Sequence, residues 1–340
     1  MRLPWREITE SLTCRGGGAT MGRMSMTYRR CGRSGVLLPE VSLGLWHNFG
    51  QGDDPQEGRA LLARALDLGI CHLDLANNYG PPPGAAEGRF GHLMARDFAA
   101  RRDEMFIATK AGHLMWEGPY GDWGSRKHLV ASLNQSLRRM RLDYVDVFYH
   151  HRPDPDTPLE ETVQALIDIV RSGKALYVGL SKYPPELFAR ACAMLAEAHV
   201  PCLLHQFRLN LIHREPGTAM LQAAAQQHTG AIAFSPLAQG VLTGKYLDRA
   251  LPEDSRAARD NSVFLTPERA VQDETRVRRV VQVAAQAGMP PAELALRWVL
   301  AQPGMTSVLI GARHVAQLEQ CARAAGRPPL EADILAALDE

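Results

Sequence analysis

Residues 145–181, VDVFYHHRPDPDTPLEETVQALIDIVRSGKALYVGLS, contain the pattern that decides the fold. Apolar runs at Val145–Tyr149 and Ala175–Gly179 have the length and the β-branched or aromatic content of buried strands. Between them, Leu159–Ser172 has apolar residues at helical spacing, and Gly173 follows at a position where glycine commonly ends a helix. A strand, a helix and a strand in this order are typical of a βαβ unit with parallel strands.

The same alternation continues along the chain from Val41 and predicts eight strands. We expect strands at Val41–Leu45, Cys71–Leu75, Phe106–Lys110, Val145–Tyr149, Ala175–Gly179, Cys202–Gln206, Ala231–Phe234 and Ser307–Ile310. We expect helices at Glu57–Leu68, Arg126–Met140, Leu159–Ser172, Pro185–Ala198, Gly217–His228, Thr266–Gly288, Ala292–Ala301 and Val315–Ala325. Eight repeats without a break in composition favour one α/β domain over residues 26–340, a (β/α)8 TIM barrel with a C-terminal helical extension.

An open, doubly wound sheet is the alternative architecture. Its dinucleotide-binding fingerprint, G-x-G-x-x-G after the first strand, is missing, because that strand ends Ser42-Leu43-Gly44-Leu45-Trp46. The segment Gly240–Tyr246 faintly resembles a phosphate-binding P-loop, but it is one residue short and has Tyr where Ser or Thr would hold magnesium. A nucleoside triphosphatase is therefore excluded.

Two further segments precede the first barrel strand. Tyr28–Arg30 and Val36–Leu38 flank Gly32 and Gly35, which predicts an N-terminal β-hairpin that closes the barrel floor. Residues 1–25 contain arginines and a glycine run but lack the apolar stretch of a secretory signal. We expect them to form a disordered N-terminal extension.

Composition excludes several classes of protein. The 340 residues include 38 basic and 37 acidic side chains, so the net charge of +1 gives no footprint for nucleic acid. The chain has no run of about 18 uncharged apolar residues, so no membrane span is expected. The six cysteines form no C-x-x-C pair and no zinc-finger spacing, which indicates a reducing, cytoplasmic location and no metal site.

Polar residues follow three neighbouring strands at the end where barrel enzymes place their chemistry. Asp74 and Tyr79 follow the second strand, Lys110 ends the third, and His150 and His151 end the fourth. Neighbouring strands lie about 4.8 Å apart, so these side chains can converge on one small volume. A lone Asp, Lys or Tyr in such a place is usually structural, but the coincidence of four at adjacent strand ends favours a catalytic site.

These and other motifs resemble the aldo-keto reductase family over nearly the whole chain from Tyr28. The matching segments are DLANNYG at 74–80, ATKAG at 108–112, HRPD at 151–154, VGLS at 178–181 and FSPLAQGVLTGKY at 234–246, and the last is the most specific. Within the family, the chain looks most like the branch that holds bacterial L-glyceraldehyde-3-phosphate reductases and voltage-gated potassium channel β subunits. NNYGPPPG at 77–84 and GPYG at 118–121 look like the bacterial reductases in particular.

The resemblance implies a catalytic tetrad of Asp74, Tyr79, Lys110 and His151. Reduction of a carbonyl leaves negative charge on its oxygen, which needs a proton donor and a second stabilising group. Tyr79 is the expected acid, with its pKa lowered by Lys110, which Asp74 holds in place. Strand alternation lets only one of His150 and His151 line the barrel mouth, and the family register selects His151.

The family binds NADP(H) across the barrel mouth, and the resemblance assigns each contact to a residue of this chain. Ser181 and Gln206 would hold the nicotinamide carboxamide, Phe234 would stack on the ring, and Trp46 would cover the site. The pyrophosphate would lie along Ser235, Pro236, Leu237, Ala238 and Gln239, beside Lys245 and Arg256, and the adenosine end beside Gly311, Arg313, Gln317 and Gln320.

The chain departs from the family pattern at several of these contacts. Lys182 stands where many relatives have Asn, although the channel-subunit branch also has a basic residue there. Gln320 and Cys321 replace the usual Glu-Asn pair at the adenine, and Arg313 replaces a common Ser. Arg313 favours NADPH over NADH if it binds the 2′-phosphate, and solvation at the surface is the alternative interpretation.

The resemblance implies reduction of small aldehydes such as L-glyceraldehyde 3-phosphate or methylglyoxal, by a homo-oligomer. Trp116, Tyr120 and Trp123 are candidates for an aromatic wall around the substrate, and Arg126, Lys127 and Arg152 for its phosphate. A nicotinamide-binding, redox-sensing regulatory subunit is the alternative, but the channel branch has Asn where this chain has His151. An aldolase that forms a Schiff base on Lys110 is a third hypothesis, and the expected pairing of Lys110 with Asp74 opposes it.

Overall fold

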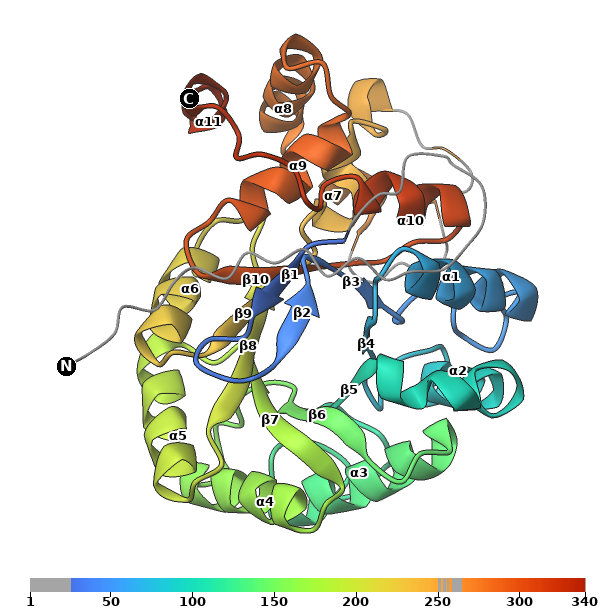
Figure 1. Cartoon of the computed structure of the whole chain (residues 1–340), viewed down its shortest axis with the longest axis vertical. Helices are drawn as coiled ribbons and strands as arrows, with labels where there is room; N and C mark the ends of the chain where they lie inside the picture. The colour runs from blue at the N-terminus through green and yellow to red at the C-terminus, as the bar shows by residue number, and fades with distance from the viewer. Residues whose placement is uncertain (1–25, 250–251, 253–254, 256, 259–264, 340) are drawn as a thin grey trace, which may run out of the picture.

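A computed structural model describes residues 26–249, 252, 255, 257–258 and 265–339. Eight parallel strands form a closed barrel in the order β10-β3-β4-β5-β6-β7-β8-β9 (Figure 1). They are β3 (Val41–Gly44), β4 (His72–Asp74), β5 (Phe106–Ala111), β6 (Val145–His150), β7 (Ala175–Ser181), β8 (Cys202–Arg208), β9 (Gly230–Phe234) and β10 (Met305–Ile310). Every strand overlaps its predicted range, so the barrel is confirmed. The predicted extension at residues 1–25 lies outside the described residues.

Helices surround this barrel, some packed directly on its strands and others on neighbouring helices. They are α1 (Pro55–Asp67), α2 (Ala85–Leu93), α3 (Arg126–Met140), α4 (Leu159–Arg171), α5 (Pro185–Glu197), α6 (Gly217–Gln226), α7 (Pro267–Val271), α8 (Glu274–Gln286), α9 (Pro291–Leu300), α10 (Val315–Ala322) and α11 (Ala332–Asp339). α3 has its predicted bounds because Ser125 caps it, accepting a hydrogen bond from the His128 amide at 3.2 Å.

The helical layer differs from the prediction in two places. The predicted helices did not include α2, or the π-helix (Met94–Phe98) and 3-10 helix (Ala99–Glu104) that follow it. The single helix predicted at Thr266–Gly288 is wrong: Thr266 caps a short α7, and the chain turns before α8. Separating the two lets Ala270 and Val271 pack against the β9 loop while Val277 faces the same crevice from α8.

The N-terminal hairpin closes the barrel floor, as predicted. β1 (Tyr28–Arg30) pairs antiparallel with β2 (Leu37–Pro39), and Figure 1 shows the two strands across the centre of the ring of strands. Cys31 and Leu38 are buried in one apolar cluster with barrel residues that include Val147 and Ile232. The hairpin is therefore part of the barrel core.

Replacing Gly32 with Ala is expected to destabilise this closure. Gly32 has φ +53°, and a Cβ there would lie 1.7 Å from the His228 carbonyl oxygen. We expect a loss of roughly 1–3 kcal/mol in the free energy of unfolding, measured in urea. Gly35→Ala is the matched control in the same turn, because nothing lies within 4 Å of its Cβ position. Equal losses in the two variants would contradict the steric argument.

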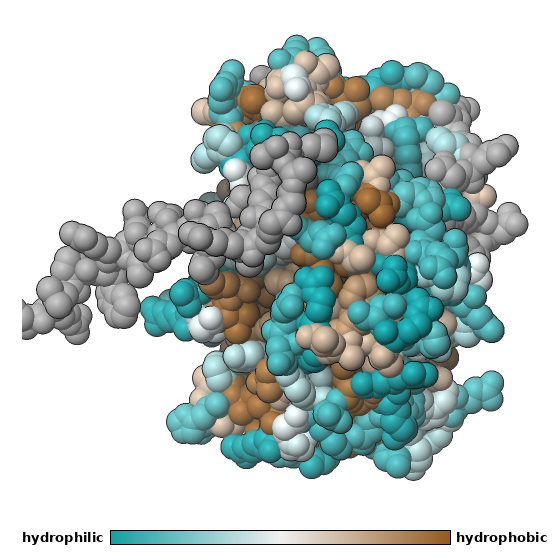
Figure 2. Space-filling view, turned by 45° about the vertical axis from the view of Figure 1, so that its right-hand side comes forward, coloured by the Kyte–Doolittle hydropathy of each residue, from teal (hydrophilic) through white to brown (hydrophobic). Residues whose placement is uncertain are grey.

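The outer surface is mixed in character. On the face that Figure 2 shows, hydrophilic side chains cover most of the area, and hydrophobic ones lie in groups between them. Among the described residues, no helix has the length and apolar character needed to cross a membrane.

Candidate active site

A cavity of about 990 Å³ opens where the barrel strands end. Its lining comes from segments that follow the strands, and it contains every predicted cofactor residue that the structure describes: Trp46, Asp74, Ser181, Lys182, Gln206, Phe234, Ser235, Pro236, Leu237, Ala238, Gln239, Lys245, Gly311, Arg313, Gln317 and Gln320. Arg256 lies outside the described residues. Barrel enzymes carry their active sites at this end.

Lys110 is buried beneath the cavity and connects the other tetrad members. Its Nζ donates to the Asp74 carboxylate and, at 2.8 Å, to the Leu75 carbonyl oxygen. The same Nζ lies 3.4 Å from Tyr79 Oη. Lys110 and Asp74 are both fully buried, so each neutralises a charge that would otherwise be unpaired in the interior.

Tyr79 stands between two rings at the cavity wall. The Trp46 ring stacks on it with centroids 5.8 Å apart, and the His151 ring meets it edge-on at 5.9 Å. The hydroxyl is thereby held between Lys110 and the cavity.

The two adjacent histidines point in opposite directions, as alternation along β6 requires. His151 lines the cavity, whereas His150 Nδ1 forms a hydrogen bond with Tyr183 Oη at 2.6 Å. Burial, then the charges of Lys110 and Lys182, holds the pKa of His151 well below its usual value. The imidazole is therefore neutral near pH 7, with one N–H to donate.

The expected lowering of the Tyr79 pKa is wrong. Burial, and then the Asp74 carboxylate, raises the Tyr79 pKa well above its usual value. In the resting protein, burial and the Asp74 carboxylate outweigh the lowering of the Tyr79 pKa that we expected from Lys110. Tyr79 is therefore a neutral phenol at physiological pH, the form that can give up a proton.

Ser181 and Gln206 lie side by side on β7 and β8. Gln206 Nε2 donates to Asp74 Oδ1 at 3.1 Å. Ser181 Oγ is buried and has no hydrogen-bond partner in the described part of the chain. A buried hydroxyl without a partner indicates that a polar group of a ligand belongs there. The residues present therefore fit a carboxamide.

The loop after β9 has a backbone suited to an anion. Ser235, Ala238 and Gln239 have positive φ angles of 53°, 46° and 60°, a conformation in which successive backbone N–H groups can form an anion-binding concavity. Asn210 Nδ2 fixes the loop by donating to the Ser235 carbonyl oxygen at 2.9 Å. A Cβ on Gly240 would lie 3.2 Å from Lys245 Nζ, so the ammonium lies against this loop.

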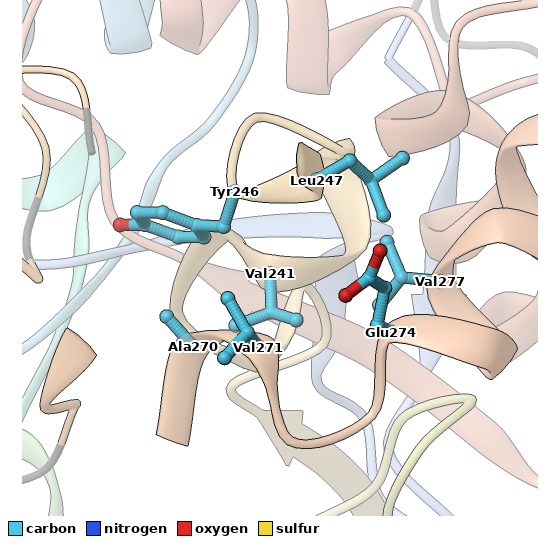
Figure 3. A pocket seen from close by; sticks show the side chains of 7 residues that line it. All are labelled: Val241, Tyr246, Leu247, Ala270, Val271, Glu274 and Val277. Carbon is cyan, nitrogen blue, oxygen red and sulfur yellow. The ribbon is translucent and has the colours of Figure 1, made fainter. Parts of the chain in front are cut away.

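Apolar contacts support the same loop from behind. Figure 3 shows Val241, Tyr246 and Leu247 from the loop facing Ala270 and Val271 of α7 and Val277 of α8. The crevice between them has no room for a water molecule, and Glu274, its charged member, pairs with Arg278. This crevice serves packing and positions the loop.

The charge of the cavity wall favours an anionic ligand. Among the described residues, the wall has five Lys or Arg (Lys182, Arg208, Lys245, Arg269 and Arg313) and two acids (Asp74 and Asp273), one of which Lys110 neutralises. An excess of fixed positive charge attracts phosphate groups.

The predicted substrate-loop residues lie elsewhere. None of Trp116, Tyr120, Trp123, Arg126, Lys127 and Arg152 belongs to the cavity wall. Trp116 packs on His128, and Arg126 pairs with Asp168. Arg152 donates to the Gly112 carbonyl oxygen at 2.7 Å and to Asp122 at 2.8 Å, and it stacks on Trp123. These side chains do not line the cavity, so the structure gives no support to the expected aromatic wall and phosphate contacts, which stay predictions.

Sequence reasoning missed His113. Its ring lines the cavity and meets the His151 ring edge-on, with centroids 4.5 Å apart. Burial, then the charge of Lys182, lowers its pKa to about 4, so it is neutral at pH 7. Its place three residues after Lys110, in the loop that leaves β5, is a signal that could have identified it.

Comparison with known proteins agrees with this geometry. Residues 40–340 match the family model described as Aldo/keto reductase family. The chain belongs to this family. It is therefore an oxidoreductase, and the resemblance inferred from its motifs is confirmed.

Similar proteins fall in both halves of the expected branch. The chain is 50% identical over 319 residues to L-glyceraldehyde 3-phosphate reductase of Escherichia coli (strain K12), covering 93% of this chain and 92% of that protein. It is 36% identical over 310 residues to a probable voltage-gated potassium channel subunit beta of Oryza sativa subsp. japonica, covering 90% of this chain and 93% of that protein. A putative subunit of the same kind from Schizosaccharomyces pombe is 33% identical over 311 residues, covering 88% of each chain.

Proposed function

We propose that this aldo-keto reductase uses NADPH to reduce small aldehydes, with L-glyceraldehyde 3-phosphate as the leading substrate and methylglyoxal as the second. The observation that carries the proposal is the contact of Lys110 Nζ with both Asp74 and Tyr79 Oη at the wall of a large, positively charged cavity. The similarity to a bacterial reductase of that substrate supports the choice.

The residues around the cavity have distinct roles in this proposal. Ser181 and Gln206 would hold the nicotinamide carboxamide, Phe234 its ring, the 235–239 loop with Lys245 the pyrophosphate, and Arg313 the 2′-phosphate. NADPH supplies a hydride when bound. Tyr79 Oη donates its proton to the substrate oxygen, and Lys110 stabilises the phenolate that remains. His151 donates a hydrogen bond to the same oxygen, and Trp46 helps to exclude water.

Replacing Lys245 with Met is expected to raise the dissociation constant of NADPH about tenfold, because one charge-assisted contact to phosphate is lost. Titration of protein fluorescence with NADPH measures the change. Lys174→Met is the matched control, because Lys174 Nζ donates to Asn134 away from the cavity. Equal NADPH affinities in the two variants would show that Lys245 does not contact the cofactor.

A direct assay tests the proposed activity. The full chain is mixed with NADPH and L-glyceraldehyde 3-phosphate, and the loss of NADPH absorbance is followed, with methylglyoxal and with NADH in parallel. Turnover of the phosphorylated aldehyde with NADPH supports the proposal. Tight NADPH binding without turnover of any aldehyde would instead support a regulatory module, which the similarity to channel subunits keeps as the second candidate.

A further inference from the structure

Three cationic side chains lie near His151, and two of them have anionic partners. Lys110 is paired with Asp74, and Arg152 is paired with Asp122. Lys182 is the third. It lines the cavity, and within the described part of the chain no carboxylate lies in ion-pair range of its Nζ. An ammonium group in this position is available to an anion from solution.

The backbone of Lys182 is held in an unusual conformation. It directly follows β7, its amide donates to the Gln206 carbonyl oxygen at 2.9 Å, and its φ is +61°. A left-handed conformation in a residue other than glycine costs roughly 1–2 kcal/mol, and such residues concentrate at functional sites. The Nζ lies 5.7 Å from the centre of the Phe234 ring, which places the charge at the reacting end of the cavity.

Lys182 and His113 both line the cavity. After burial, the Lys182 charge is the largest cause of the lowered His113 pKa, and it also lowers the pKa of His151. On the neighbouring strand β8, the charge of Arg208 is, after burial, the largest cause of the lowered His213 pKa. Burial, then Lys110 and Arg152, lowers the Lys182 pKa to about 8, so the ammonium is still mostly charged at pH 7.

We propose that Lys182, together with His113 of the same cavity wall, binds the phosphate ester of the substrate and makes the enzyme prefer phosphorylated aldehydes. An ammonium and an imidazole N–H are both donors to phosphate oxygens. The His113 ring contacts the His151 ring, and Lys182 lines the same cavity, so both are placed to reach a ligand bound beside Tyr79. This inference deepens the proposed function and rests on it, and it moves Lys182 from the cofactor contacts to the substrate contacts.

The test compares L-glyceraldehyde 3-phosphate with unphosphorylated L-glyceraldehyde. We expect Lys182→Met to lower the ratio of kcat/KM for the phosphorylated aldehyde to kcat/KM for the unphosphorylated one about tenfold or more. Lys182→Arg, which keeps the charge, is expected to retain most of this preference. Lys245→Met is the matched control: it removes a cation of the same cavity and is expected to weaken NADPH binding while the ratio is preserved. Thermal unfolding shows whether each variant is folded.

Other outcomes overturn the inference. If Lys182→Met weakens NADPH binding but keeps the ratio of the two kcat/KM values, Lys182 is a cofactor ligand. The unmodified chain could instead prefer succinic semialdehyde over butanal, and Lys182→Met could lose that preference while the ratio for the two glyceraldehydes stays the same. This result would show that Lys182 binds a carboxylate.

Failure of the proposed function gives a different result, because neither glyceraldehyde would then be reduced by the unmodified chain. Calorimetric titration of the NADPH-bound protein with L-glycerol 3-phosphate, which has no carbonyl, tests the phosphate site independently. We expect binding to the unmodified chain that weakens about tenfold in Lys182→Met. Equal binding to both proteins would overturn the proposed site.

Discussion

Replacing Tyr79 with Phe is expected to lower kcat for aldehyde reduction by about 10²–10⁴-fold, the usual contribution of a positioned general acid. The substitution removes the hydroxyl that lies 3.4 Å from Lys110 Nζ. It keeps the ring that packs between Trp46 and His151, so the cavity wall retains its shape. Because burial and Asp74 raise the Tyr79 pKa, the hydroxyl is protonated in the unmodified enzyme, and its loss removes a proton donor.

Steady-state oxidation of NADPH with L-glyceraldehyde 3-phosphate measures this effect. Tyr177→Phe is the matched control, because Tyr177 lies on β7 and stacks on Phe106 near the barrel floor. We expect the control to change kcat less than twofold, within the usual range for changes away from a site. Full activity in Tyr79→Phe would overturn the proposed acid.

Replacing Lys110 with Met is expected to lower the free energy of unfolding by about 3–5 kcal/mol, the range measured when one partner of a buried ion pair is removed. Asp74 would keep the hydrogen bond from Gln206 Nε2 at 3.1 Å, but its charge would have no counter-ion in a fully buried position. Activity should fall as well, because the phenolate left on Tyr79 would lose its nearest cation.

The double variant Asp74→Asn, Lys110→Met separates charge from packing. Removing both charges leaves no unpaired ion, so we expect most of the stability lost in Lys110→Met to return, while activity stays low. Urea unfolding of the four proteins gives the interaction energy of the pair. If the losses in the two single variants add in the double variant, the pair contributes nothing to stability and the interpretation of Lys110 is wrong.

Local sequence patterns were sufficient for the parts of the fold that depend on local chemistry. The eight strands are short apolar runs between turn residues, and Ser125 caps α3 through its own side chain, so both could be identified without knowledge of the rest of the chain. The convergence of Asp74, Tyr79 and Lys110 also follows from the sequence, because neighbouring parallel strands end at the same edge.

Other features depend on contacts between distant segments, and the sequence alone did not determine them. The break between α7 and α8 follows from packing against the β9 loop. Arg152 is held outside the cavity by its contacts with Asp122 and Trp123, which lie about 30 residues earlier in the chain.

The sequence by itself determined a barrel, a family and four catalytic candidates, because strand length, turn residues and strand-end chemistry are local properties. Only the tertiary structure decided that His113 borders His151, that Lys182 has no acidic partner among the described residues and that the Tyr79 pKa is raised. Burial and the distances between charges set these properties, and both depend on which loops meet at the barrel mouth.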